Sequence, residues 1–306
     1  MRVKKVVVAG ATGKLGSKIV KALLDQGANV TAMVRSTSNR TMLEKIGVRN
    51  YVIGDMMDRT SLNEALSPEY GFDAIVSSAA GYTRHSKGDN EKTDTIGYQN
   101  LVDAAKNARI PRFVLISILE CDKAANVPHF YNKYLTEKYL TQKLQPFIAL
   151  RPGAFFDFAE DRLIKKIKKG VIPVFFQGVD YGTIYTPDLA RYAAMAAISL
   201  PEAELNTTID VGWRTPVNSS SIVSAFTKVL GKQFRAKLII PSFVIKVIAP
   251  IMAIFIGFIR DMLEMVKWVN TGVYVSKNTE KQLKLFGDLP TIEEAVGRFV
   301  KDNNLF

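Results

Sequence analysis

The amino-acid sequence predicts an α/β fold built on a doubly wound parallel sheet, followed by a smaller, mostly helical C-terminal lobe. Two observations predict it. Short apolar runs alternate with longer amphipathic stretches over the first two-thirds of the chain, and a glycine-rich turn follows the first run. The runs show little polar alternation, as expected for parallel strands covered on both faces. The predicted strands are Val6–Ala9, Val30–Val34, Tyr51–Gly54, Ala74–Ser77, Phe113–Ser117, Phe147–Leu150 and Thr207–Val211.

Amphipathic stretches between these runs predict helices, among them Gly16–Gln26, Asp94–Asn107 and Phe130–Lys143. A chain of 306 residues is long enough for such a domain and an added lobe. We therefore expect a nucleotide-binding domain over residues 1–155. A substrate lobe over 156–306 is expected to be interleaved with the last strands of the sheet.

Composition and charge restrict the class of protein. The formal net charge is +12, which favours an anionic ligand or surface. Nucleic-acid binding would rest on charge alone, because no zinc-binding spacing or helix-turn-helix signature is present, and we expect neither a nucleic acid nor a metal. The one cysteine, Cys121, excludes an internal disulfide, and the N-terminal apolar run is too short for a signal peptide. These features predict a cytoplasmic protein.

The strongest local signal is the turn Gly10-Ala-Thr-Gly13-Lys-Leu-Gly16, which follows a strand and opens a helix. Gly10 allows a tight exit from the strand, Gly13 lets the backbone approach a pyrophosphate, and Gly16 lets the helix pack closely on the strand. The N-terminus of the helix then offers unpaired N–H groups and a favourable dipole to a phosphate. The turn, with Thr12, Lys14 and Leu15, therefore predicts a dinucleotide site on a Rossmann sheet.

The end of the second predicted strand indicates which dinucleotide is bound. Proteins that select NAD usually place an acidic residue there to hold the ribose 2′-hydroxyl. This chain instead has Arg35 and Ser36, with Arg40 close behind. An arginine can make a bidentate contact with the 2′-phosphate of NADP, and Lys14 can add charge to the same group. We therefore expect NADP(H) as the cofactor.

With these motifs, the chain resembles an atypical short-chain dehydrogenase/reductase of the NmrA-like, or NAD(P)H-binding, group. The resemblance extends over most of the length and is specific for the superfamily rather than for a substrate. The matching segments are the glycine turn, Arg35, Gly54-Asp55-Met-Met-Asp58, Asn100-Leu-Val-Asp-Ala-Ala, Arg112-Phe-Val-Leu-Ile-Ser117, Lys133-x-x-x-Glu137 and Leu150-Arg-Pro-Gly-Ala-Phe155.

The resemblance also implies further cofactor contacts. Asp55 and Met56 would lie beside the adenine. The alternative for Asp55 and Asp58 is that they form a turn and a helix cap, which for Asp58 is as well supported as a direct contact. Ser78 and Ala79 would lie along the cofactor. The remaining expected contacts are Ser117 and Lys133 and, bordering the nicotinamide, Pro152, Gly153, Ala154 and Phe155.

Catalysis is where the chain departs from the family pattern. Many relatives use a serine, a tyrosine that donates a proton, and a lysine four residues after the tyrosine that holds the nicotinamide ribose. If Lys133 is that lysine, the tyrosine position is His129 and the serine position is Leu119. His129 or Tyr131 could then donate the proton, or Lys133 alone could polarise the substrate.

A second Tyr-x-x-x-Lys match, Tyr134 with Lys138, competes with this alignment. Lys138 lies five residues after Lys133, about 140° around a helix, so the two lysines cannot both face a cofactor. The register with Glu137 and with the Arg-Pro-Gly segment favours Lys133.

The C-terminal third contains a strongly apolar segment, Pro241–Trp268. Its longest apolar run, Val247–Ile259, is broken by Pro250 and is shorter than the roughly 20 residues that a spanning helix needs. We expect a buried helix that forms one wall of the substrate lobe. The alternative is a peripheral membrane contact through residues 243–268 beside basic residues. The basic stretch Arg162–Lys169 is expected to be a solvated helix face.

Together these features predict an NADPH-dependent reductase that transfers hydride to a small apolar or aromatic substrate such as a carbonyl, enone or quinone. The missing serine and tyrosine favour a rival, a non-catalytic protein that senses NADP(H). A membrane-associated accessory protein is a third hypothesis. We expect the chain to act as a monomer or homodimer.

Overall fold

The computed structural model describes residues 2–81, 92–174, 176, 178–240 and 244–305. The chain forms two compact units. The first comprises Met1–Arg151 and Thr186–Ile209, and the second comprises Pro152–Tyr185 and Asp210–Phe306.

A seven-stranded sheet forms the frame of the first unit. In spatial order its strands are β3 (Asn50–Ile53), β2 (Asn29–Val34), β1 (Lys5–Ala9), β4 (Ala74–Ser77), β5 (Phe113–Ile116), β6 (Phe147–Pro152) and β10 (Thr207–Val211). Neighbouring strands from β3 through β6 pair in parallel, with Val6 opposite Val30 on one side and Ala74 on the other. The predicted doubly wound sheet is confirmed. The first and last residues of each predicted strand lie within two positions of those observed.

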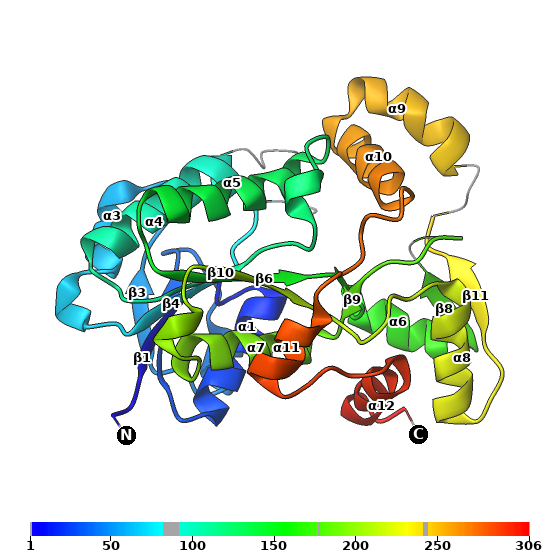
Figure 1. Cartoon of the computed structure of the whole chain (residues 1–306), viewed down its shortest axis with the longest axis horizontal. Helices are drawn as coiled ribbons and strands as arrows, with labels where there is room; N and C mark the ends of the chain where they lie inside the picture. The colour runs from blue at the N-terminus through cyan, green and yellow to red at the C-terminus, as the bar shows by residue number, and fades with distance from the viewer. Residues whose placement is uncertain (1, 82–91, 175, 177, 241–243, 306) are drawn as a thin grey trace. The chain divides into compact units, whose positions relative to one another are not determined.

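Helices cover both faces of this sheet. Figure 1 shows α3, α4 and α5 on one face and α1 and α7 on the other. Their bounds, with the short turns of the same unit, are α1 (Lys14–Asp25), α2 (Thr41–Lys45), α3 (Arg59–Ala65), η1 (Pro68–Tyr70), η2 (Lys92–Gly97), α4 (Tyr98–Asn107), η3 (Cys121–Lys123), α5 (Pro128–Gln142), α7 (Thr186–Ile198) and η4 (Glu202–Glu204). The predicted helix Asp94–Asn107 begins as a π-helical segment, η2, and continues as α4.

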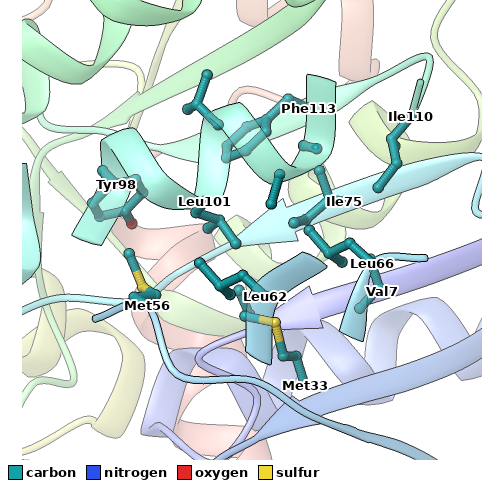
Figure 2. Packing of buried hydrophobic residues seen from close by; sticks show 14 of the residues in the cluster. Val7, Met33, Met56, Leu62, Leu66, Ile75, Tyr98, Leu101, Ile110 and Phe113 are labelled. Atoms are coloured by element: carbon teal, nitrogen blue, oxygen red, sulfur yellow. The ribbon is translucent and has the colours of Figure 1, made fainter. Parts of the chain in front are cut away.

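The core on the α3–α4 face is drawn in Figure 2. Val7, Ile75 and Phe113 point from the central strands toward Leu62 and Leu101 on the helices, and all five side chains are fully buried. Burial of side chains of this size contributes roughly 1.5–3 kcal/mol each. The apolar runs of the sequence therefore meet in one continuous core that fixes the carboxyl ends of β1 and β4 relative to each other.

The second unit contains two short parallel strand pairs and six helices within the described residues. The strands are β7 (Ala154–Phe155) with β9 (Thr183–Ile184), and β8 (Val171–Val174) with β11 (Arg235–Leu238). The helices are α6 (Glu160–Ile167), α8 (Ser219–Leu230), α9 (Ala249–Phe255), α10 (Gly257–Val269), α11 (Thr279–Phe286) and α12 (Ile292–Asp302), with the π-helical segment η5 (Val244–Ile248) before α9. The sequence predicts a mostly helical lobe here, and about half of this unit is helical.

Aromatic rings form the core of the second unit. The Phe156 ring lies 5.2 Å from that of Phe299 and 5.3 Å from that of Trp213, and the Phe226 ring packs on Phe156 and Phe299. In α6, Leu163 and Ile167 face this interior, whereas Arg162, Lys165 and Lys166 are exposed. The expected solvated basic face is confirmed.

The prediction of a buried helix in Pro241–Trp268 is wrong for the described residues. Pro241–Phe243 lie outside them. In η5 and α9 no side chain is buried, and α10 buries only Val269. The apolar run is helical, but in the described part of the chain most of its side chains stay partly or fully exposed. Across the described part of the chain, we find no helix with the length and apolar character needed to cross a bilayer.

Candidate cofactor site

The glycine turn leaves the carboxyl end of β1 and leads into α1. Gly10 has a φ of +79°, and a Cβ atom there would lie 2.8 Å from the Ala79 nitrogen. A Cβ on Gly16 would lie 2.0 Å from the Gly10 oxygen. Side chains at these two positions are therefore excluded, by the left-handed backbone and by direct collision respectively.

Gly13 is the N-cap of α1, and its position differs from that of the other two glycines. Its backbone is extended, with φ −74° and ψ 163°, and its surface is exposed. Among the described residues no side chain caps the first turn of α1, and that turn contains no acidic residue. The N–H groups of Lys14, Leu15 and Gly16 and the positive end of the helix dipole are thus free to meet an anion. Thr12 and Lys14 are exposed beside them.

Arg35 immediately follows β2 and is exposed together with Ser36. Its backbone N–H donates to the Ser38 hydroxyl at 3.1 Å, which fixes the turn while leaving the guanidinium in solvent. Arg40 has a different environment, since its guanidinium lies 5.1 Å from the centre of the Tyr51 ring. Of these cations, Arg35 best fits the predicted 2′-phosphate contact.

The acidic residues after β3 mainly shape the backbone. The Asp58 carboxylate accepts from the N–H groups of Thr60 and Ser61 and so caps α3. Asp55 accepts from the Met57 N–H at 2.9 Å, which forms a turn. Met56 is buried, and its carbonyl accepts from the Asn100 side chain. The capping alternative therefore holds for Asp58, and contacts of Asp55 and Met56 with adenine stay predictions.

Ser78 and Ala79 follow β4, the neighbour of β1 in the sheet, at the point where the strand order reverses. Doubly wound sheets bind ligands at such a switch point. The Ser78 N–H donates to the Ala9 carbonyl at 3.1 Å, and Ala79 lies directly against Gly10. The structure thus brings the predicted Ser78–Ala79 segment beside the glycine turn.

Lys133 extends from α5 to the same place. Its Nζ donates to the Ala79 carbonyl at 3.0 Å and to the Tyr98 hydroxyl at 2.9 Å, and it lies 3.9 Å from an Asp94 carboxylate oxygen. Burial by itself lowers the pKa of Lys133, but its contacts with Tyr98 and Asp94 outweigh burial and raise the pKa above its usual value. The amine is therefore an ammonium group at neutral pH.

Tyr98 and Asp94 were not identified from the sequence. The Tyr98 hydroxyl accepts from Lys133 and from the Ser77 hydroxyl and donates to the Ala79 carbonyl at 2.6 Å. Asp94, 1% exposed, accepts from the Gly81 N–H at 2.9 Å. One feature of the sequence could have pointed to them, namely their spacing of four residues, which places both side chains on one face of the segment formed by η2 and α4.

The competing Tyr134–Lys138 match lies on the other side of α5. Lys138 is exposed, and its ammonium group lies 5.6 Å from the centre of the Tyr134 ring. This pair is a surface cation–π contact. Of the two lysines, Lys133 is therefore the one that the helix directs toward Ala79 and the glycine turn.

A second buried network joins β5, α5 and β6. Arg151 binds Glu137 through two hydrogen bonds of 2.5 and 3.0 Å, and the Ser117 hydroxyl donates to the same carboxylate at 2.6 Å. Burial and the nearby Glu137 charge raise the pKa of Cys121 to about 12, so its thiol stays protonated at neutral pH. Ser117 thus supports the strand end, and the protonated thiol of Cys121 is a poor nucleophile at neutral pH.

The two predicted proton donors differ in environment. His129 is buried near the start of α5, and burial lowers its pKa to about 4, so it is a neutral imidazole at neutral pH and a weak acid. Tyr131 is half-buried, with its ring 5.6 Å from that of Tyr134. These environments favour Tyr131 over His129 as a donor, while both assignments stay predictions.

The lowered pKa of His129 predicts acid sensitivity. An unfolded histidine titrates near 6.5, so the unfolded chain takes up a proton that the folded chain refuses as the pH falls from about 6.5 to 4. This single residue is expected to remove about 3 kcal/mol from the free energy of unfolding over that window. Urea unfolding at several pH values measures it.

His129→Gln is the matched variant for this measurement, because carboxylates also titrate near pH 4. The stability of the variant should fall less steeply between pH 6.5 and 4 than that of the wild type. Parallel pH profiles for the two proteins would contradict a buried neutral imidazole.

The segment predicted to border the nicotinamide belongs to the second unit. Pro152 ends β6, and Ala154 and Phe155 form β7. A Cβ on Gly153 would lie 2.3 Å from the Gly182 carbonyl carbon, so glycine is required for this close backbone approach. Contact of these four residues with a nicotinamide stays a prediction.

The described residues fit a dinucleotide at the switch point. The first turn of α1 offers uncapped N–H groups, the glycines keep Cβ atoms out of the cradle, and Arg35 offers a cation at the end of β2. Within the described ranges, no group of three or more His, Cys, Asp or Glu residues is placed to hold a metal ion. Fold and site together define a dinucleotide-binding α/β protein.

The chain belongs to the NAD(P)H-binding family, whose sequence model matches residues 10–175. This match confirms the resemblance inferred from the motifs and establishes NAD(P)H as the cofactor class. It covers the glycine turn, Arg35, the Ala79 region and Lys133.

Individual relatives lie at low sequence identity. The Photosystem II assembly factor Ycf39 of Cyanophora paradoxa is 26% identical over 231 residues, which cover 75% of this chain and 70% of the relative. The NADPH-dependent quinone oxidoreductase QOR2 of Escherichia coli, solved with NADPH, matches 96% of this chain and 99% of its own at 18% identity and a TM-score of 0.73.

The triphenylmethane reductase of Citrobacter sp., solved with NADP(H), gives a TM-score of 0.74 at 19% identity, with the same coverage of 96% and 99%. At these identities, the likeness to solved structures shows the fold.

Proposed function

We propose that this protein is an NADPH-dependent reductase that acts by hydride transfer on a small apolar or aromatic substrate, such as a carbonyl, enone or quinone-like compound. The observation that carries the proposal is that the glycine turn and Lys133 both lie against the same residue, Ala79. The Ala79 nitrogen lies against Gly10, and the Ala79 carbonyl accepts from the Lys133 ammonium group. A cation thus stands at the switch point, next to the phosphate turn.

Each part of the site has a distinct role in this proposal. The uncapped amides of α1, with Thr12 and Leu15, hold the pyrophosphate, and Arg35 with Ser36 and Lys14 holds the 2′-phosphate. Ser78, Ala79 and Lys133 hold the nicotinamide half, and Tyr98 keeps the Lys133 ammonium group in place. When bound, NADPH supplies the hydride.

The substrate side of the reaction needs a proton donor. Tyr131 fits this role better than His129, because the buried neutral imidazole holds no readily released proton at neutral pH. The names of the solved relatives, a quinone oxidoreductase and a triphenylmethane reductase, support an aromatic or quinone-like substrate.

The choice of NADPH over NADH is expected to depend on Arg35. In Arg35→Ala, the affinity for NADPH should fall by roughly tenfold to a hundredfold, because a charge-assisted contact with the 2′-phosphate is lost. NADH, which lacks this phosphate, should bind the variant as weakly as it binds the wild type. Titration of nicotinamide fluorescence with both cofactors measures this.

Arg49→Ala is the control for this titration, since Arg49 is an exposed arginine just before the amino end of β3 rather than at the carboxyl end of a strand. It should leave both affinities unchanged. Equal loss of NADPH and NADH affinity in Arg35→Ala would remove Arg35 from its proposed role.

Turnover tests the proposed activity itself. NADPH oxidation should be measured with a panel of quinones, enones and apolar carbonyl compounds. We expect at least one class of compound to be reduced by the wild type and by His129→Gln. In Tyr131→Phe, kcat should fall about a hundredfold or more, because the hydroxyl that acts as the general acid is lost. The same loss in His129→Gln instead would move the donor to His129.

A second function is favoured by the arrangement around α5. The serine position of the family pattern is the buried Leu119, the tyrosine position is the neutral His129, and Lys133 is engaged by Ala79, Tyr98 and Asp94. These features suit a protein that binds NADP(H) and regulates or assembles a partner without turnover. The Ycf39 relative is named an assembly factor, which supports this alternative.

Cofactor binding and turnover, measured together, separate the two functions. Tight NADPH binding with no reduction of any compound in the panel would favour the sensor or accessory protein. Reduction that disappears when cofactor binding is blocked would favour the enzyme.

A further inference from the structure

The structure assigns a membrane-docking surface to the segment that follows β11. We propose that residues 244–256, which comprise η5, α9 and Ile256 and are called here the α9 segment, insert into the surface of an anionic lipid bilayer. This inference is independent of the proposed enzymatic function.

The first observation is the exposure of the α9 segment. Several of its large apolar side chains are strongly exposed, with Phe255 84%, Ile254 73% and Ile251 61% exposed. Val247, 59% exposed, precedes Ile251 by about one helical turn, so these residues follow a spacing of four, three and one. That spacing places them in one stripe along the helix.

The other face of α9 packs on its neighbour, α10, and Figure 1 shows these two helices side by side. Ile248, Met252 and Ile256 are each about 40% exposed and so are only partly covered. Soluble monomers rarely expose a contiguous apolar patch of this kind. The stripe is therefore a surface with a function, because its exposure to water is unfavourable.

The second observation is the charge around the stripe. Between Val211 and Arg260 the sequence contains no aspartate or glutamate, yet it contains seven basic residues. Four of them lie near the α9 segment in the sequence and are exposed, namely Arg235, Lys237, Lys246 and Arg260. Ile239 and Ile240, directly after β11, add exposed apolar side chains between these cations.

An exposed apolar stripe with exposed cations close to it in the sequence matches the chemistry of an anionic lipid surface. Each basic residue near such a surface contributes about 1 kcal/mol, and the apolar face gains from burial below the headgroups. A second copy of this chain is a poorer occupant, because the residues around the stripe carry more basic than acidic side chains, Asp261 and Glu264 of α10 being the nearby acidic ones, and two such surfaces would repel each other. The apolar run is also too short to span a bilayer, so docking at the interface is the geometry that fits.

The test uses the full chain and two kinds of vesicle, pure phosphatidylcholine and phosphatidylcholine mixed with phosphatidylglycerol. At low salt the wild type should sediment with the anionic vesicles and not with the neutral ones. Ile254→Glu/Phe255→Glu should weaken this binding by at least about tenfold, since two apolar side chains lose their burial and two carboxylates meet an anionic surface.

Leu144→Glu is the matched control, because Leu144 is 78% exposed but lies in the first unit, outside the α9 segment. It should bind vesicles like the wild type. Lys237→Glu/Lys246→Glu should also weaken binding by about tenfold or more if both cations face anionic lipid. Thermal unfolding and NADPH binding should be unchanged in all three variants, which shows that they are folded.

Insertion is read directly from Phe255→Trp, whose added tryptophan fluorescence should shift to shorter wavelength with anionic vesicles. The proposal is overturned if the wild type sediments with neither vesicle, or if the glutamate variant at 254 and 255 binds as tightly as the wild type. A concentration-dependent dimer that the same double substitution abolishes would also overturn it and assign the stripe to a second copy.

Discussion

Gly13→Asp is expected to lower the affinity for NADPH by about a hundredfold, or roughly 2.7 kcal/mol, without unfolding the protein. Gly13 is exposed at the N-cap of α1, and its extended backbone is open to any L-residue. An aspartate there can accept from the amides of the first helical turn and cap the helix. The carboxylate would then occupy the position that the phosphate needs and repel it.

Gly13→Ala is the control that separates the carboxylate from the added Cβ. A Cβ at this position would lie 3.2 Å from the Gly10 oxygen, a tight contact that a small shift relieves. We therefore expect the alanine variant to lose much less affinity than the aspartate variant. Nicotinamide fluorescence titration and thermal unfolding of both variants give the answer, and near-normal NADPH binding by Gly13→Asp would place the anion site elsewhere.

Lys133→Met is expected to lower the free energy of unfolding by about 3 kcal/mol, because it leaves the Asp94 carboxylate buried beside a neutral side chain. The ammonium group lies 3.9 Å from Asp94, and both side chains are almost fully buried. It also donates to Tyr98 and Ala79, whose oxygens would lose a charged donor. Urea denaturation of the variant measures the loss.

A double-mutant cycle identifies the cause of that loss. Asp94→Asn removes the buried charge, so Lys133→Met/Asp94→Asn should be more stable than Lys133→Met alone. Lys138→Met, on the exposed side of the same helix, should change stability by less than about 0.5 kcal/mol. Independent, additive effects of the two substitutions at 133 and 94 would show that the pair is not coupled.

Much of the first unit could be predicted because its signals are local. Continuous apolar runs specify strands covered on both faces, and the backbone of the turn requires Gly10 and Gly16 whatever else surrounds them. The register of Lys133 with Glu137 and Arg151 could also be predicted, and the structure brings Glu137 and Arg151 into direct contact.

The partners of Lys133 could not be predicted in this way. Tyr98 and Asp94 belong to a different segment, 35 and 39 residues before it, and their contact depends on how α4 and α5 lie on the sheet. The family pattern places a tyrosine four residues before the lysine, whereas in the structure Tyr98 reaches Lys133 from the neighbouring helix α4. Likewise, the pKa of His129 follows from burial, which no residue pattern near it indicates.

The α9 segment shows the same difference between what local sequence determines and what contacts between distant segments decide. Its composition determined that it would be helical and apolar, because aliphatic and aromatic side chains gain free energy on leaving water. Whether they leave water depends on a covering surface, and among the described residues α10 packs on one side of α9 while the stripe from Val247 to Phe255 stays exposed. The sequence by itself therefore determined the sheet, the phosphate turn and the cofactor class. Only the tertiary structure decided which side chains meet Lys133 and which apolar surface stays exposed, because both depend on contacts between segments distant in the chain.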